Sequence, residues 1–182
     1  MPIKASNEKL GWSAPYFNLL DISGNILSYD DIKGENGTVI AFICNHCPYV
    51  IAIADRLSKE ANYLNKQSIS TVAIMSNDVS QYPEDSYENM KKFAEKHNFN
   101  FPYLYDETQE IAKNYNAVCT PDIFGFNSKN ILCYRGRIDS GVMNTENSNF
   151  DRELFNAMIK IKNDGQGPIK QYNSFGCSIK WK

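Results

Sequence analysis

Two cysteines separated by two residues, Cys44 and Cys47, are the residues of this 182-residue chain best suited to chemistry. They lie in the stretch VIAFICNHCPYV, where an apolar run ends at the first cysteine and Pro48 follows the second. A pair at this spacing can form a redox-active disulfide, bind a metal, react with peroxide, or remain as two buried thiols. The secondary structure around the pair helps to choose among these uses.

The elements around the pair place it where a thiolate is favoured. Residues 37–43 form a continuous apolar, β-branched run, which predicts a strand covered on both faces. Residues 48–67 carry apolar side chains at helical spacing, and proline suits the first turn of a helix. At this junction, helix N–H groups and the helix dipole lower a thiol pKa. A three-residue offset at a helix start also allows the Cα separation of about 5.5 Å that a disulfide needs.

The rest of the chain alternates strands and helices, which predicts an α/β fold. We expect a second buried strand at residues 68–75, helices at 86–98 and 107–116, a hairpin turn at 127–130, and an amphipathic helix at 149–164. The tail from about residue 164 is rich in Gly, Asn and Lys, and is expected to be irregular. No internal repeat divides the chain, so we expect one domain over residues 1–182.

Composition and charge argue against several classes of partner. Hydrophobic residues make up 42% and charged residues 22%, which is typical of a soluble globular chain. The formal net charge of −2 gives no reason to expect nucleic acid or an anionic membrane as partner. The sequence shows no signal-peptide core and no apolar run near the roughly 20 residues of a membrane helix. We therefore expect a cytoplasmic protein, in which five cysteines indicate redox or metal chemistry rather than structural disulfides.

Several motifs occur in the order that one protein family has them. GWSAPYFNLLDISGN is similar to an opening Ala-Pro-x-Phe hairpin, CNHCPYV to an active-site motif, SNDVSQYPEDS to a characteristic loop, YDETQEIAKNYNAVCTPDIFGFN to a segment with a cis-proline, and YRGRID and GCSIKWK to later signatures. On these motifs the chain resembles the thioredoxin-fold redoxins, and within them the peroxiredoxin-like branch of alkyl hydroperoxide reductase and thiol-specific antioxidant proteins. The resemblance implies a thioredoxin-like three-layer fold, with a mixed central sheet flanked by helices and an N-terminal hairpin extension.

The resemblance also implies roles for individual residues. Cys44 would be the attacking thiolate, as the more exposed cysteine of the pair, and Cys47 would resolve the mixed disulfide. His46 would tune the thiolate, because a protonated imidazole nearby favours the charged form. Thr120 and a cis Pro121 would face the pair and hold the substrate.

Four further residues could assist the pair or only pack. Cys119 could resolve a mixed disulfide, complete a metal site or pack, and packing is our first interpretation. Arg135 resembles an arginine near the peroxiredoxin active site, and the alternative is a surface residue of the strand in YRGRID. Cys133 is expected in the core, and Cys177 is expected to anchor the tail rather than to act as a remote resolving thiol.

Two positions where the chain departs from the family pattern help to choose between thiol–disulfide exchange and peroxide reduction. Peroxiredoxins carry Thr three residues before the peroxide-reacting cysteine, where this chain has Cys44. Thioredoxins carry Trp before the first cysteine, where this chain has Ile43. We therefore predict a thiol–disulfide oxidoreductase with no cofactor, regenerated by a thioredoxin- or glutathione-type reductant; the sequence indicates no oligomeric state.

Two other functions are kept as hypotheses. The first is a thiol peroxidase that reduces hydroperoxides with the same pair. The second is a copper- or zinc-binding protein that uses Cys44, His46, Cys47 and Cys119, since thiolate and imidazole suit those ions. The sequence contains no second CxxC and no HxxxH that would complete a closed tetrahedral metal site, so we predict no bound metal.

Overall fold

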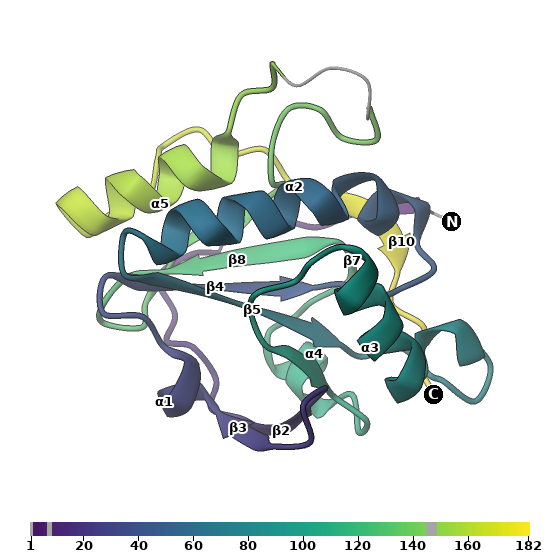
Figure 1. Cartoon of the computed structure of the whole chain (residues 1–182). Helices are drawn as coiled ribbons and strands as arrows, with labels where there is room; N and C mark the ends of the chain where they lie inside the picture. The colour runs from purple at the N-terminus through teal and green to yellow at the C-terminus, as the bar shows by residue number, and fades with distance from the viewer. Residues whose placement is uncertain (1, 7–8, 145–148) are drawn as a thin grey trace.

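The computed structural model of the chain describes residues 2–6, 9–144 and 149–182. A central seven-stranded sheet has helices on both faces, as Figure 1 shows. In chain order the elements are β1 (Pro2–Lys4), β2 (Asn18–Asp21), β3 (Ile26–Ser28), α1 (Tyr29–Ile32), β4 (Gly37–Phe42), α2 (Pro48–Asn65), β5 (Ile69–Met75), η1 (Pro83–Asp85), α3 (Tyr87–Lys96), β6 (Tyr103–Tyr105), α4 (Glu110–Asn114), β7 (Cys119–Thr120), β8 (Asp122–Phe126), β9 (Leu132–Gly136), α5 (Glu153–Asp164) and β10 (Phe175–Ser178).

The large sheet is mixed, as expected. Its strand order is β3-β2-β6-β5-β4-β8-β9. Strands β4, β5 and β6 run parallel to one another, and β2, β3, β8 and β9 join through antiparallel pairs. The β2–β3 hairpin confirms the N-terminal extension, and the β8–β9 pair confirms the hairpin predicted around residues 127–130.

Strand β4 lies in the middle of the sheet because every one of its residues is apolar or small enough to be buried. Alternate side chains of a strand point to opposite faces. Val39 and Ala41 therefore join the core under α2, α3 and α5, whereas Ile40 and Phe42 join the core under α1 and α4. This two-sided burial fixes where the strand ends, and hence where the two cysteines lie.

The C-terminal tail is more ordered than the sequence indicated. Strand β10 lies between β1 and β7 in a small three-stranded antiparallel sheet, near the first turn of α2 (Figure 1). The expectation of an irregular tail from about residue 164 was therefore wrong for residues 175–178. A four-residue strand that contains Gly176 has no periodicity of its own, and the β7 edge supplies the pairing that forms it.

Two further expectations concern extent. The prediction of one domain over residues 1–182 includes residues 1, 7–8 and 145–148, which lie outside the described residues. Within the described part of the chain, no helix has both the length and the apolar composition needed to cross a bilayer.

Candidate active site

The CxxC pair lies where the buried strand β4 gives way to the helix α2. Cys47 is the N-cap residue of α2, with extended backbone, and Pro48 occupies the first turn. The N–H groups of Val50 and Ile51 point back to the Cys47 carbonyl at 3.0 and 2.9 Å. The strand–helix junction predicted from the sequence is thus present, and the second cysteine stands at the N-terminus of the helix.

Both thiols face the segment that contains the cis-proline. The Thr120–Pro121 peptide bond is cis, as the resemblance implied. The Cys44 Sγ lies 3.3 Å from the Thr120 Oγ1, and the Cys47 Sγ lies 3.2 Å from the Thr120 carbonyl oxygen. Both cysteines also belong to the same buried cluster under α2. The structure therefore brings together Cys44, Cys47, Thr120 and Pro121, four residues that the sequence pointed to.

Exposure does not single out Cys44 as the attacking residue. Only 1% of Cys44 and 0% of Cys47 is exposed, because β4 and α2 bury both side chains in the core. The basis on which Cys44 was expected to attack, its greater exposure, is thus absent.

The electrostatics of the pair favour Cys47 as the thiolate. The pKa of Cys47 is lowered to about 5, because the Cys44 thiol donates a hydrogen bond to its sulfur and both the thiol and the backbone N–H of Cys177 donate as well. The pKa of Cys44 is raised, because it is the donor to Cys47, is buried, and lies near the charge of Asp85. A single proton shared by the pair therefore stays on Cys44.

Asp85 is a residue of the site that the sequence reasoning missed. Its side chain is fully buried and accepts the backbone N–H of Asn45 over 2.8 Å and the Asn77 amide over 2.7 Å. The Tyr103 hydroxyl donates to the Asn45 side chain over 3.0 Å. The only signal in the sequence was that Asp85 lies in a polar loop after a predicted buried strand. In the structure that strand, β5, pairs with β4. This loop holds the residues between the two cysteines in place.

The His46 side chain contacts the same loop. Its Nδ1 lies 2.8 Å from the Asp85 Oδ2, close enough for an ion pair with the protonated ring but not aligned for a hydrogen bond. The ring also stacks on Tyr82, with centroids 5.5 Å apart and planes 8° from parallel. His46 is therefore positioned between a carboxylate and an aromatic ring, and its effect on the thiols stays a prediction.

A different ligand set from the expected one meets at the site. Among the described residues, side-chain ligand atoms of Cys44, His46 and Asp85 all lie within 4.8 Å of one another. The sequence hypothesis had combined the cysteines and His46 with Cys119. The group gains Asp85, because η1 packs against the CxxC loop, and it contains neither Cys47 nor Cys119.

The two auxiliary candidates support the cis-proline segment. Cys119 is fully buried, its thiol donates to the Pro121 carbonyl over 3.5 Å, and burial and the charge of Asp122 raise its pKa. The Arg135 guanidinium donates to both oxygens of the buried Asp122 and to the Asn116 carbonyl. The arginine is thus occupied by the residue that follows Pro121.

The two remaining cysteines differ from each other. Cys133 is half-buried on β9 and its thiol points to the Ile131 and Gly165 carbonyls, away from the pair. Cys177 is half-buried on β10, directly opposite Thr120 in the strand register. The tail therefore places a third thiol in contact with Cys47, which the sequence alone did not indicate.

The edge at Thr120 is occupied by this same strand. The resemblance implied that the Thr120 backbone would pair with an incoming peptide or thiol compound. In the structure, Cys177 pairs with Thr120 and Ser178 with Cys119, so the chain itself fills that edge. An extended polypeptide cannot pair there while β10 is in place.

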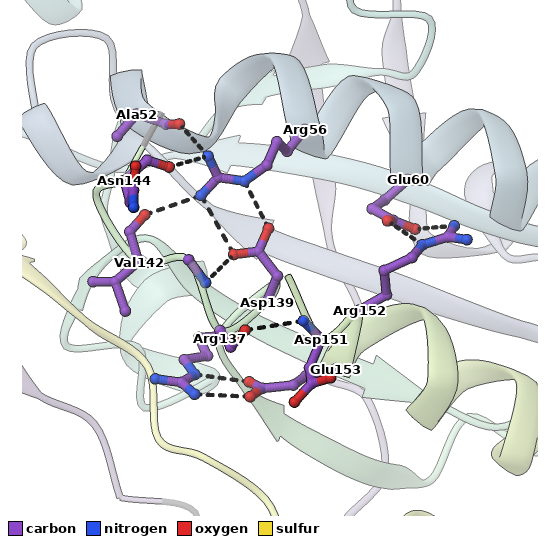
Figure 2. A network of polar contacts seen from close by, with 12 residues as sticks. Ala52, Arg56, Glu60, Arg137, Asp139, Val142, Asn144, Asp151, Arg152 and Glu153 are labelled. Carbon is purple, nitrogen blue, oxygen red and sulfur yellow. Dashed lines mark hydrogen bonds and ion pairs between the residues drawn. The ribbon is translucent and has the colours of Figure 1, made fainter. Parts of the chain in front are cut away.

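A cavity of about 280 Å³ opens beside Pro121. Its lining residues are mainly apolar and aromatic, with a few charged side chains: Lys4, Tyr49, Ile53, Pro121, Arg137, Ile138, Asp139, Val142, Tyr172, Asn173 and Phe175. Figure 2 shows how one wall is held, with Arg56 of α2 bound to Asp139 and to the Val142 carbonyl. In the same view Arg137 pairs with Glu153 at 2.7 Å, so its charge is already matched. The cavity therefore offers an apolar site next to the cis-proline.

Comparisons with known proteins agree with this geometry. Residues 10–137 match the AhpC/TSA family. An uncharacterized conserved protein from Geobacillus kaustophilus is 44% identical, with a TM-score of 0.94 over 100% of this chain and 97% of that chain. A hypothetical protein from Sinorhizobium meliloti 1021 is 32% identical, with a TM-score of 0.92 over 98% of each chain. A search of curated protein sequences gave no significant match.

More distant structures share the fold alone. A secreted disulfide oxidoreductase from Mycobacterium tuberculosis is 22% identical, with a TM-score of 0.55 over 64% of this chain and 79% of that chain. A peroxidoxin from the same organism is 19% identical, with a TM-score of 0.57 over 68% of this chain and 82% of that chain. These neighbours confirm the thioredoxin-like fold predicted from the sequence.

Proposed function

The chain belongs to the AhpC/TSA family, and on that basis we propose that it is a thiol–disulfide oxidoreductase that cycles Cys44 and Cys47 between dithiol and disulfide. One observation carries the proposal: the two thiols lie at the start of α2 and both contact Thr120, next to the cis Pro121. Family membership and the thioredoxin-like fold support redox chemistry of this kind in general.

In the proposed reaction Cys47 attacks and Cys44 resolves, the reverse of the roles expected from the sequence. The Cys47 thiolate attacks one sulfur of a disulfide RSSR, which forms a Cys47–SR mixed disulfide and releases RS⁻. Cys44 then attacks the Cys47 sulfur, which forms the Cys44–Cys47 disulfide and releases the second RS⁻; the Cys44 proton ends on a released thiol. The lowered pKa of Cys47 supports this order, since the thiolate is the nucleophile.

The occupied Thr120 edge supports small disulfides or exposed disulfide groups as substrates, rather than extended polypeptides. The cavity beside Pro121 could receive an apolar part of such a compound. A thioredoxin- or glutathione-type reductant would then restore the dithiol. A cytoplasmic location fits this need for reduction and remains part of the proposal.

Peroxidase activity is the second candidate, and the low pKa of Cys47 favours it. Two observations count against it. Cys44 stands where peroxiredoxins carry a threonine, and the Arg135 guanidinium is engaged by Asp122 and Asn116.

One experiment separates these candidates. Reduced protein is incubated separately with a small disulfide, hydrogen peroxide and Cu(I), and the state of each cysteine is mapped by mass spectrometry. We expect the disulfide to produce a Cys44–Cys47 bond while Cys133 stays free. Rapid conversion of Cys47 by peroxide alone would favour the peroxidase, and stoichiometric copper that protects Cys44 would favour the metal protein.

A further inference from the structure

The buried position of the CxxC pair raises a problem of access. Thiol–disulfide exchange needs an incoming sulfur to reach a sulfur of the disulfide, and its rate depends on that access. Cys44 and Cys47 are 1% and 0% exposed, so solution thiols have almost no direct path to either sulfur. A further thiol that lies beside the pair and is also open to solvent would give a reducing thiol a route to the buried disulfide.

Cys177 is such a thiol. It lies opposite Thr120 in the β10–β7 register, the Thr120 carbonyl oxygen is 3.2 Å from the Cys47 Sγ, and the Cys177 side chain is only half-buried. The three thiols therefore form a series from the interior to the surface: Cys44, Cys47 and Cys177.

The sequence around Cys177 holds it in this position. A Cβ at Gly176 would meet the Thr120 carbonyl oxygen at 2.0 Å, so only glycine lets β10 approach the cis-proline segment this closely. On one side of Cys177, the Phe175 ring packs edge-on against Tyr49 of α2, with centroids 5.2 Å apart. On the other side, the Lys180 N–H donates to Asn77 and its carbonyl accepts from Asp78. The strand is thus fixed at both ends.

We propose that Cys177 is a third catalytic thiol, through which reducing thiols in solution reach the buried disulfide. This inference rests on the proposed function, because it describes how the same disulfide is reduced. On this proposal, reducing thiols reach the disulfide through β10, the strand that pairs with Thr120 and prevents an extended polypeptide from pairing there.

The exchange needs three balanced steps. First, the Cys177 thiolate attacks the Cys47 sulfur of the Cys44–Cys47 disulfide; a Cys47–Cys177 bond forms and Cys44 leaves and takes up a proton. Second, an external thiolate attacks the half-buried Cys177 sulfur, and Cys47 leaves. Third, a second external thiolate attacks the sulfur of the external compound and releases Cys177, so two external thiols become one disulfide.

The second step has a favourable leaving group. A thiol of lower pKa leaves faster in such exchange, and Cys47 has the lowered pKa of the three. The attack is also directed to Cys177, since that sulfur is the accessible one of the bond.

The first test traps the intermediate. Reduced Cys44→Ser protein is treated with one equivalent of oxidised glutathione, and its disulfides are mapped by mass. We expect a Cys47–Cys177 bond in most molecules. Glutathione retained on Cys47, with Cys177 as a free thiol, would overturn the proposal.

The second test measures reduction rates. Oxidised wild type, Cys177→Ser and the control Cys133→Ser are reduced with excess dithiothreitol, and the Cys44–Cys47 bond is followed by acid quenching and alkylation. We expect reduction of Cys177→Ser to be at least about tenfold slower, because the thiol that relays exchange to the buried disulfide is lost. Reduction of Cys133→Ser should be within about twofold of wild type. A wild-type rate in Cys177→Ser would overturn the proposal.

Thermal unfolding of the three proteins checks that a slower rate is not caused by a folding defect. The Cys44→Ser experiment tests the Cys47–Cys177 bond in a protein that keeps Cys177. The results also separate this inference from the proposed function. If oxidised wild type contains no Cys44–Cys47 bond, the proposed function fails; if that bond forms but Cys177→Ser is reduced normally, only the role of Cys177 fails.

Discussion

Asn45 donates its backbone N–H to the buried carboxylate of Asp85 over 2.8 Å. This bond joins the two residues between the cysteines to η1, which follows β5 in the chain. Since Asp85 also lies beside His46 and raises the pKa of Cys44, one carboxylate both shapes the CxxC loop and affects which cysteine carries the proton.

Asp85→Asn should lower the pKa of Cys44, because the amide keeps the shape of the carboxylate but removes its charge. It should also lower the free energy of unfolding by about 1–3 kcal/mol, since a buried donor on Asn45 or Asn77 loses its acceptor. Ultraviolet thiolate absorbance in a Cys47→Ser background measures the pKa, and urea denaturation measures the stability. Asp30→Asn is the control, because that carboxylate is exposed and pairs with Lys33; an unchanged Cys44 titration would contradict the role of Asp85.

The lowered pKa of Cys47 predicts how the stability of the reduced protein depends on pH. The thiol has a pKa of about 8.5 when unfolded and about 5 when folded. The unfolded state therefore binds more protons in this window, and stability rises with pH. The contribution is complete above about pH 8.5 and is lost as the pH falls through about 5.

Urea denaturation of reduced wild type and Cys47→Ser across this range measures the effect. The difference between the two proteins should grow with pH, whereas Cys133→Ser should follow wild type. A difference that is constant with pH would show that Cys47 is not ionised in the folded protein.

Hydrogen peroxide should be a poor substrate. A thiol with an ordinary pKa is only slightly ionised at neutral pH, so complete ionisation raises its thiolate concentration by only roughly thirtyfold. Without the threonine hydroxyl or a free Arg135, we expect stopped-flow oxidation no more than about a hundredfold faster than that of a free thiol. Cys44→Thr should raise the rate and the isosteric Cys44→Val should not; a wild-type rate many orders higher would make the peroxidase the leading candidate.

His46→Ala should raise the pKa of Cys47, the thiolate of the pair, and make the reduction potential more negative by tens of millivolts. A positive charge near the pair favours the thiolate form, and a less stable thiolate makes the disulfide harder to reduce. Equilibration against glutathione measures the potential, and thiolate absorbance measures the pKa. His97→Ala is the control, because the other histidine pairs with Asp55 of α2; equal shifts in both variants would remove the tuning role of His46.

Arg135→Met should destabilise the protein by about 3–5 kcal/mol at neutral pH, because it leaves the fully buried Asp122 without its partner. Burial already raises the pKa of Asp122, and loss of the guanidinium raises it further, so the deficit should shrink as the pH falls and the carboxyl becomes neutral. Urea denaturation at two pH values measures both effects. Lys33→Met, which breaks an exposed pair, should cost no more than about 1 kcal/mol.

The sequence by itself determined the strand–helix junction that holds the CxxC pair. The β-branched run before Cys44, the helical spacing after Cys47 and the position of Pro48 are local features, and local features depend on residues close together in the chain. The order of elements followed in the same way, and the motif around Pro121 identified the cis-proline through the family resemblance.

Only the tertiary structure decided what surrounds the two thiols. Asp85 and Cys177 lie 41 and 133 residues beyond Cys44, and their loop and tail show no periodicity that predicts a position. They reach the pair because η1 follows the strand beside β4, and because β10 pairs with the edge that β7 leaves open. Burial likewise depends on every layer of the fold together, which is why the sequence assigned the attacking role to Cys44 and the packed structure favours Cys47.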